Sequence, residues 1–207
     1  MANHPITQEV LDKAFSYNDF NQLVEKLYSE GTTTNGNISG TYMEYTKLNL
    51  QRSQRIDKRG KLTPETQLAA EQFEGKLTWV VITEGWCGDS AQTLPYINHI
   101  AKASDNIDLK IVLRDEYPEV MDAFLTNGSK SIPKLVMLDT NTLEVVGEWG
   151  PRPADVQEKY MAERKDPEVG PAEASKNLHL WYARNKGVEV QKEIAAILES
   201  LKIEKTA

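Results

Sequence analysis

Residues 77–90 read LTWVVITEGWCGDS, and this stretch decides the fold that we expect for the chain. Residues 77–83 are almost continuously apolar and rich in β-branched side chains, which is typical of a strand buried on both faces. Over residues 89–103 the apolar side chains recur with helical spacing. Cys87, the only cysteine of the chain, therefore lies where a strand gives way to a helix.

A thiol at such a junction is a candidate nucleophile, because backbone N–H groups and the helix dipole stabilise its thiolate. We expect a moderately lowered pKa for Cys87, since the nearby carboxylate of Asp89 opposes part of this effect. If Cys87 is the N-cap, Ser90 falls at N3 and its hydroxyl is placed to donate to the sulfur. The alternative is that Cys87 is a small buried apolar residue without chemistry.

The elements that follow complete an α/β core. A second strand over 109–113 makes a βαβ unit with parallel pairing. A short helix is predicted over 118–125, and two strands over 134–138 and 143–149 flank a turn and form a hairpin. The predicted order from residue 77 to about 164 is β-α-β-α-β-β-α.

Helical patterns lie on both sides of this core. Phe20, Leu23 and Val24 begin one amphipathic face, and Thr63-Pro64 is a helix start signal. Three further helices are expected after Pro153. We therefore expect a single domain over 1–207 with three parts: a helical N-terminal extension (1–76), the core (77–164) and a helical C-terminal extension (165–207).

Three short motifs resemble those of the thioredoxin family. Trp86-Cys87-Gly88 resembles the start of its Trp-Cys-Gly-Pro-Cys motif, and Pro95 stands where thioredoxins carry the proline that kinks the active-site helix. Ile132-Pro133 resembles the Ile-Pro of thioredoxins whose peptide bond is cis. The resemblance implies a thioredoxin fold, with a central mixed sheet of about four strands flanked by helices, to which helical N- and C-terminal extensions are added.

The resemblance also implies roles for single residues. Cys87 and Ser90 take the catalytic positions, Trp86, Gly88, Asp89 and Pro133 support the site, and Ile132 binds the backbone of an extended substrate. Two departures are informative. Val81 replaces the buried carboxylate of thioredoxins and Ser90 replaces the second cysteine, so no internal disulfide can form. The extensions and residues 147–153 resemble a bacterial thioredoxin-like family whose motif often ends in Asp-Cys.

Topology suggests further neighbours of Cys87, because ligands gather at the carboxyl ends of parallel strands. Arg114 follows the second strand and is a candidate for holding a thiolate or a substrate carboxylate, the alternative being a structural ion pair. Trp149 ends the last strand and Arg152 follows in the next loop. Both are placed to approach the edge of the sheet at which Cys87 lies. Trp149 and Arg114 join Ile132 as predicted substrate-binding residues.

Composition excludes several classes of protein. A net charge of −7 and a pI near 5.1 argue against a nucleic-acid partner. The sequence has neither an apolar run long enough to span a membrane nor a signal-peptide pattern, and it has one cysteine, so we expect a cytoplasmic protein. Three scattered histidines and one cysteine predict no metal site and no cofactor.

Three functional hypotheses follow. The first is a monothiol thiol–disulfide oxidoreductase, in which Cys87 forms mixed disulfides with protein or low-molecular-weight disulfides and an external thiol resolves them. The second is a non-catalytic adaptor that keeps only the binding groove. The third is the iron–sulfur chemistry of monothiol glutaredoxins, which share a Cys-Gly-x-Ser motif but lack the preceding tryptophan. The sequence leaves the oligomeric state open.

Overall fold

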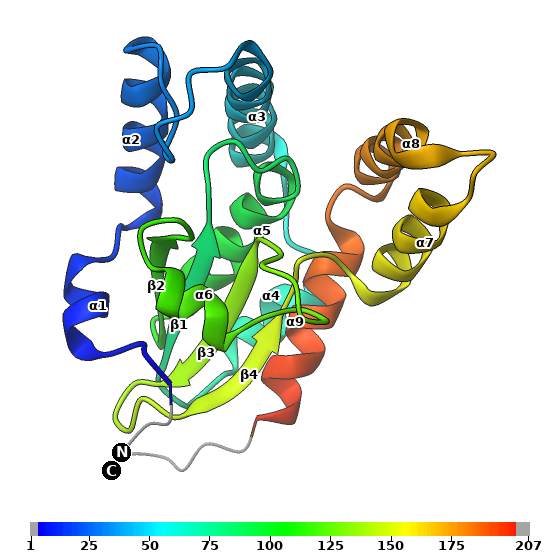
Figure 1. Cartoon of the computed structure of the whole chain (residues 1–207). Helices are drawn as coiled ribbons and strands as arrows, with labels where there is room; N and C mark the ends of the chain where they lie inside the picture. Colours follow the sequence, from blue (N-terminus) through cyan, green and yellow to red (C-terminus); the bar gives the residue numbers. More distant parts are fainter. Residues whose placement is uncertain (1–3, 202–207) are drawn as a thin grey trace.

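A mixed four-stranded sheet with helices on both faces forms the centre of the molecule (Figure 1). The structure is a computed structural model that describes residues 4–201. The strands β1 (Leu77–Thr83), β2 (Ile107–Leu113), β3 (Lys134–Asp139) and β4 (Val145–Trp149) are arranged in the order β2-β1-β3-β4. This confirms the predicted α/β thioredoxin fold with helical extensions.

The pairing of the strands follows the predicted pattern. β1 is parallel to β2 and antiparallel to β3, and β3 and β4 form the hairpin. All seven residues of β1 are buried, as its continuous apolar character predicts. β4 begins at Val145 rather than at the predicted residue 143, because Leu143 has a left-handed backbone with φ of 58° and ends the turn.

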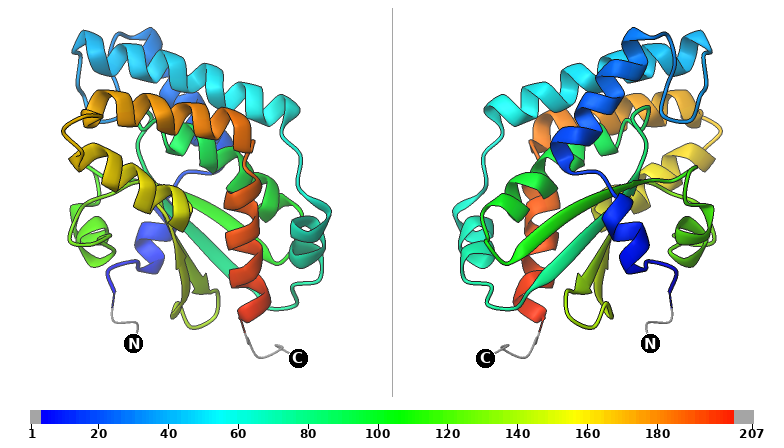
Figure 2. Two further views of the ribbon diagram at one scale, coloured as in Figure 1. Left: turned by 90° about the vertical axis from the view of Figure 1, so that its right-hand side faces the viewer. Right: turned by 90° about the vertical axis from the view of Figure 1, so that its left-hand side faces the viewer.

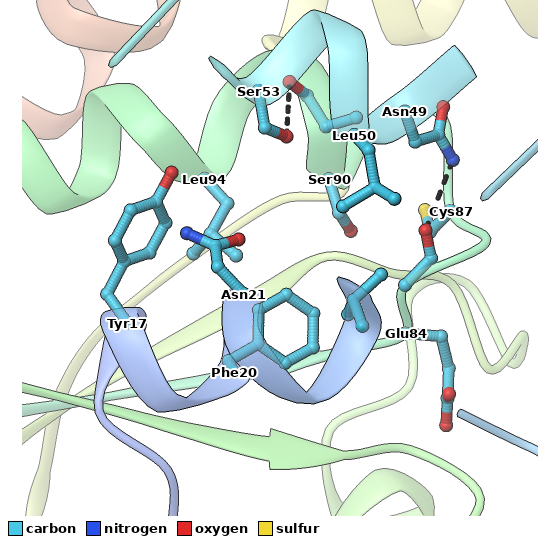
Figure 3. Close-up of a pocket in the computed structure, with 13 residues that line it drawn as sticks. Tyr17, Phe20, Asn21, Asn49, Leu50, Ser53, Glu84, Cys87, Ser90 and Leu94 are labelled. Atoms are coloured by element: carbon cyan, nitrogen blue, oxygen red, sulfur yellow. Dashed lines mark hydrogen bonds between the residues drawn. The ribbon is translucent and has the colours of Figure 1, made fainter. Parts of the chain in front are cut away.

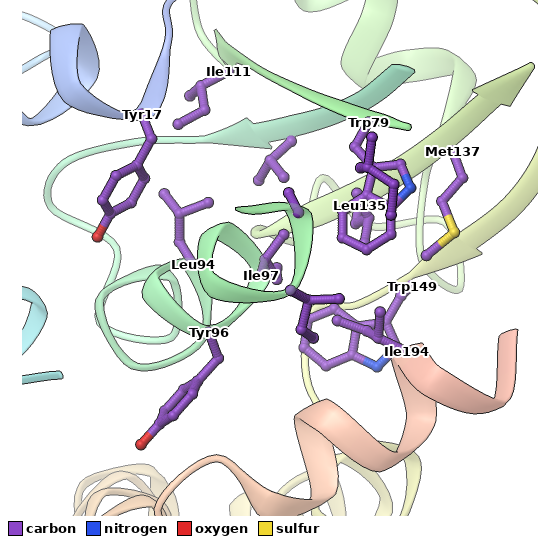
Figure 4. Close-up of a cluster of buried hydrophobic side chains, with 14 of the residues drawn as sticks. Tyr17, Trp79, Leu94, Tyr96, Ile97, Ile111, Leu135, Met137, Trp149 and Ile194 are labelled. Atoms are coloured by element: carbon purple, nitrogen blue, oxygen red, sulfur yellow. The ribbon is translucent and has the colours of Figure 1, made fainter. Parts of the chain in front are cut away.

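Side chains alternate between two apolar layers on the two faces of β1. Trp79, labelled in Figure 4, and Val81 belong to the larger layer, whereas Val80 and Ile82 belong to the smaller one. The larger layer is covered by α2 (Tyr17–Ser29), α4 (Pro64–Glu71), α5 (Ser90–Lys102) and α9 (Val188–Ser200). The smaller is covered by α1 (Gln8–Lys13) and α6 (Pro118–Ala123).

Helices of the N-terminal part lie near the end of the sheet where β1 ends and the loop with Cys87 begins. α3 (Gly40–Arg59) packs against α2 and α5. Thr63 caps α4 by accepting a hydrogen bond from the Thr66 amide, as the start signal predicts. The six-residue α1 was not predicted, because it is too short to show a helical period.

The C-terminal helices form two units. α7 (Ala154–Lys165) and α8 (Gly170–Asn185) pack as a hairpin at one side of the sheet, and α9 returns along α4 (Figures 1 and 2). The hairpin has its own small core of Val156, Leu178 and Tyr182. Over residues 4–201, no helix is both long and apolar enough to cross a membrane.

Candidate active site

The candidate site is the loop that joins β1 to α5. The Cys87 amide donates to the Glu84 carbonyl at 3.1 Å, and the Cys87 carbonyl accepts from the Ala91 amide at 3.1 Å. Regular helix begins only at Ser90, with Asp89 as the residue before it. The residue before the regular helix is Asp89, not Cys87, but Cys87 makes the predicted cap bonds: its carbonyl accepts from the Ala91 amide, and the Asp89 and Ser90 amides hydrogen-bond to its sulfur.

The Cys87 thiol is buried against the segment before β3. Only 7% of the residue is exposed, and Sγ donates to the Ile132 carbonyl oxygen at 3.3 Å. The Ile132–Pro133 peptide bond is cis, and both residues are buried. A second cis bond, Gly150–Pro151, was not predicted. Ile132 therefore contacts the sulfur itself through its backbone.

Two hydroxyl groups extend from the other side of the sulfur. The buried Ser90 Oγ accepts from Thr83 Oγ1 at 2.6 Å, and the Ser90 side chain hydrogen-bonds to Cys87 in a way that favours the thiolate. Because Ser90 Oγ accepts from Thr83, its own proton is available for the hydrogen bond to Cys87. Thr83 is the last residue of the apolar strand β1. A hydroxyl at this position is the sequence feature that could have indicated the Thr83–Ser90–Cys87 relay of hydrogen bonds.

The pKa of Cys87 is raised to about 11, first by burial and next by the negative charge of Asp89. Hydrogen bonds from Ser90 and from the backbone of Asp89 and Ser90 act in the opposite direction but do not compensate. The moderately lowered pKa that the sequence predicts is therefore not found. The helix start is present, but the thiol is too deeply buried for it to dominate.

Asp89 is held in a network from the C-terminal half of the chain. Arg152 binds its carboxylate through two contacts, Nε to Oδ1 at 2.9 Å and Nη2 to Oδ2 at 2.5 Å. Tyr182 Oη donates to Oδ1 at 2.8 Å. Both charged side chains are nearly buried, 12% exposed for Asp89 and 13% for Arg152. The network ties the α7–α8 hairpin to the active-site loop.

Helices of both extensions cover the loop. The Asn49 side chain of α3 donates to the Gly85 carbonyl at 3.3 Å (Figure 3). A Cβ atom at Gly88 would lie 3.3 Å from His179 Cε1 of α8 and 3.6 Å from Arg52 Nη1 of α3. Gly88 is therefore required for close approach of these helices. None of these three neighbours was predicted, since they act across the fold rather than along the sequence.

Arg114 and Trp149, the remaining predicted substrate-binding residues, lie in different environments. The Arg114 guanidinium lies 4.8 Å from the centre of the Trp86 ring and pairs with Asp115 at 2.7 Å, so the predicted structural ion pair forms. It also interacts electrostatically with Cys87. Trp149, in contrast, is a core residue whose Nε1 donates to Glu193 of α9 at 2.6 Å, so its indole is committed to packing.

A buried carboxyl group that was not assigned a role, Glu84, lies three residues before Cys87. It accepts from the hydroxyl of Thr34 and from the Asp115 amide at 3.0 Å, and burial raises its pKa. Beside it, α2, α3 and α5 enclose a cavity of about 20 Å³ against Cys87 (Figure 3). That volume fits about one water molecule, so a partner cannot reach the sulfur from this side.

A metal centre finds no support here, since within residues 4–201 no three His, Cys, Asp or Glu side chains gather in a way that could hold an ion. A sequence model of the family described as thioredoxin matches residues 36–166, more than half of the chain. The chain belongs to the thioredoxin family. The match includes α3 of the N-terminal extension and ends just after α7.

Two solved structures resemble the chain over nearly its whole length, each with a TM-score of 0.60 and 17% sequence identity. One is PA1234, a protein of unknown function from Pseudomonas aeruginosa, with 93% of this chain and 96% of that chain covered. The other is an HIV epitope-scaffold, with 94% and 98% covered. They show that the fold includes the extensions. No curated protein matches the sequence significantly.

Proposed function

We propose that this thioredoxin-family protein is a monothiol thiol–disulfide exchange protein whose Cys87 rests protonated and covered. The observation that carries the proposal is the hydrogen bonding of the Cys87 thiol, which donates to the Ile132 carbonyl and is bonded by the Ser90 hydroxyl, itself an acceptor from Thr83. These groups hold a thiol in a fixed position at a strand-to-helix junction, where an incoming disulfide meets both the sulfur and the backbone before Pro133.

The exchange has two balanced steps. The Cys87 thiolate attacks one sulfur of a disulfide, a new S–S bond to Cys87 forms, and the other sulfur leaves as a thiolate. A second, external thiolate then attacks the partner's sulfur in the mixed disulfide, which releases Cys87 and forms a new disulfide on the partner. Ser90 cannot take the place of this external thiol, because a hydroxyl cannot form a disulfide.

The raised pKa limits the rate of the first step. Compared with a free thiol of pKa about 8.5, a pKa of about 11 lowers the thiolate fraction at neutral pH about 300-fold. The more basic thiolate is a better nucleophile, which returns a factor of about 10 to 20. We therefore expect exchange about 20-fold slower than for a free thiol, before any further effect of burial.

The test is the pH dependence of the reaction with an aromatic disulfide that releases a coloured thiolate. The release rate should rise about tenfold per pH unit from about pH 7 to about pH 10, with no plateau below about 11. Cys87→Ser should release nothing. Ser90→Cys should shorten the lifetime of the mixed disulfide, because the second thiol then resolves it internally.

The adaptor hypothesis is favoured by one observation, the near-complete burial of Cys87. It predicts that the folded protein releases no coloured thiolate at any pH up to about 10 and reacts only after unfolding in urea. That result, with a free thiol detected in the unfolded chain, would replace exchange by binding as the proposed function.

A further inference from the structure

A second cavity lies away from Cys87, between the C-terminal end of α3, the loop after it, α5 and the junction of α8 with α9. Its volume is about 560 Å³. This is within the range of about 300 to 1,000 Å³ that small-molecule sites occupy. We call it the basic cleft, because four cationic side chains line it: Arg55, Arg59, Lys61 and Lys186.

An aromatic ring is fixed in the wall of the basic cleft. A Cβ atom at Gly187 would lie 2.3 Å from Tyr96 Cε2, and one at Gly60 would lie 3.1 Å from Tyr96 Cε1. The Tyr96 ring is thus held between two backbone segments that approach it only because they carry no side chain. The ring belongs to the larger apolar layer and is only 5% exposed (Figure 4).

The loop that forms the opposite wall is also anchored. Gln191 of α9 is fully buried, its Oε1 accepts from the Thr63 amide at 2.7 Å, and its Nε2 donates to the Lys61 carbonyl at 3.2 Å. A buried side chain that satisfies two loop groups holds the loop in one position. The cleft is therefore formed before any ligand enters, which lowers the cost of binding.

The charge of the basic cleft is unusual for this chain. The sequence carries 31 acidic residues and a net charge of −7, yet no acidic side chain lines the cleft. Within residues 4–201 none of its four cations forms an ion pair. Burial lowers the pKa of Arg52, and the positive charge of Arg55 lowers it further, a like-charge interaction that an anion would relieve.

We propose that the basic cleft binds a small multivalent anion that carries phosphate or carboxylate groups. Arg55 and Arg59 offer planar guanidinium groups, which bind such oxygens through paired hydrogen bonds. Lys61 and Lys186 add point charges at the rim. Tyr96 and Gln92 line the cleft as buried groups, 5% and 6% exposed, and make its wall rigid.

The test is titration calorimetry of the full chain with pyrophosphate, adenosine monophosphate and citrate at low ionic strength. We expect saturable binding of at least one probe that weakens at least tenfold in Arg55→Gln/Arg59→Gln. The control Lys26→Gln/Lys47→Gln removes the same charge from two exposed positions outside the cleft and should leave the affinity unchanged. Stronger binding of the first two probes indicates a phosphate ligand, and stronger binding of citrate a carboxylate.

Two results would overturn the proposal: no saturable binding of any probe, or an equal loss in the cleft variant and its control. The second would mean that the probes respond to net charge alone. Lys61→Gln is a second test in case the double variant does not fold. The Lys61 side chain is exposed, and only its backbone carbonyl bonds to Gln191, so this substitution leaves the loop anchored. A partial loss of affinity in this variant, with unchanged thermal unfolding, supports the proposal.

Discussion

The two sides of the Cys87 loop are built from different chemistry. On the core side, the sulfur meets neutral hydrogen-bonding groups that β1, α5 and the segment before β3 provide, namely Thr83, Ser90 and the Ile132 carbonyl. On the extension side, the loop meets charges, because Arg152 and Tyr182 bind Asp89 and Arg52 lies over Gly88.

The difference explains the state of the thiol. On the neutral side the Ser90 hydroxyl favours the thiolate, whereas the Ile132 carbonyl accepts from the S–H group and favours the thiol. Burial of the sulfur and the carboxylate of Asp89, which Arg152 and Tyr182 hold in place, also disfavour the thiolate. Arg152 does not reverse the effect of Asp89 on Cys87. The thioredoxin-type junction thus carries a covered, protonated thiol, and its neighbour Asp89 is held both by Arg152 of the predicted core and by Tyr182 of the C-terminal extension.

The largest effect is expected on the extension side, from Arg152→Met. It leaves the Asp89 carboxylate nearly buried with Tyr182 as its remaining side-chain donor, and breaking such a pair costs about 3 kcal/mol in the free energy of unfolding. Urea denaturation at neutral pH measures the loss.

The matched control for Arg152→Met is Lys176→Met on α8, which removes an exposed ion pair with Glu173. Exposed pairs contribute about 0 to 1 kcal/mol, so this variant should stay close to the wild type. If Arg152→Met loses less than about 1 kcal/mol, the extension side does not hold the loop as described.

Asp89→Asn should accelerate alkylation of Cys87. The charge of Asp89 raises the pKa of the thiol, so its removal lowers that pKa and increases the thiolate fraction at any pH below it. We expect about a fivefold faster reaction at about pH 8, equivalent to about 1 kcal/mol of charge–charge interaction. Iodoacetamide labelling followed by mass spectrometry gives the rate.

Asp89→Asn also leaves Arg152 without its ion-pair partner, and loosening of the loop would accelerate labelling too. Two controls are therefore labelled beside it: Arg152→Met, which breaks the same pair but keeps the Asp89 charge, and Tyr182→Phe. Tyr182→Phe removes one hydrogen bond to the carboxylate but keeps both the charge and the packed ring. Its labelling rate should remain within about twofold of the wild type. Equal acceleration in Asp89→Asn and in either control would assign the effect to exposure of the sulfur rather than to charge.

On the core side, Ser90→Ala should act in the opposite direction. It removes the hydroxyl that stabilises the thiolate and leaves Thr83 Oγ1 without its acceptor. We expect about threefold slower labelling and a loss of about 1 kcal/mol in unfolding free energy. Ser90→Thr restores the hydroxyl and is the matched control. A labelling rate in Ser90→Ala equal to that of the wild type contradicts the relay.

The same division separates what the sequence could predict from what it could not. β1, the position of Cys87 and the Ile132–Pro133 segment follow from short-range patterns: a continuous apolar run, one thiol after it and one Ile-Pro before the next strand. The core side of the site was therefore predictable. The placement of Trp149 was not, because a strand-end aromatic fits a core and a binding edge equally well.

The extension side depends on contacts between distant parts of the chain. Topology placed Arg152 at this edge correctly, but no periodicity links it to Asp89, 63 residues away, or links Tyr182 to Asp89, 93 residues away. The sign of the Cys87 pKa shift was missed for the same reason. A helix start lowers a thiol pKa in water, but the outcome here depends on how completely α3 and α8 cover the loop.

The smallest expected effect concerns Glu84, a buried carboxyl group on which Arg114 acts electrostatically but which, within residues 4–201, forms no direct ion pair of the kind that Asp89 has. Burial raises its pKa in the folded protein above the unfolded value of about 4.3, so the folded state holds the proton more tightly. The stability from this group is fully present below about pH 4.3 and is lost as pH rises through the folded pKa.

Glu84→Gln cannot titrate, and its amide can still accept from the Asp115 amide and donate to the Thr34 hydroxyl. The variant should therefore gain roughly 0.5 kcal/mol over the wild type at neutral pH, and this gain should vanish near pH 4 in urea denaturation. A loss at neutral pH would mean that the ionised carboxylate is needed there, and that the two sides of the loop both depend on charge.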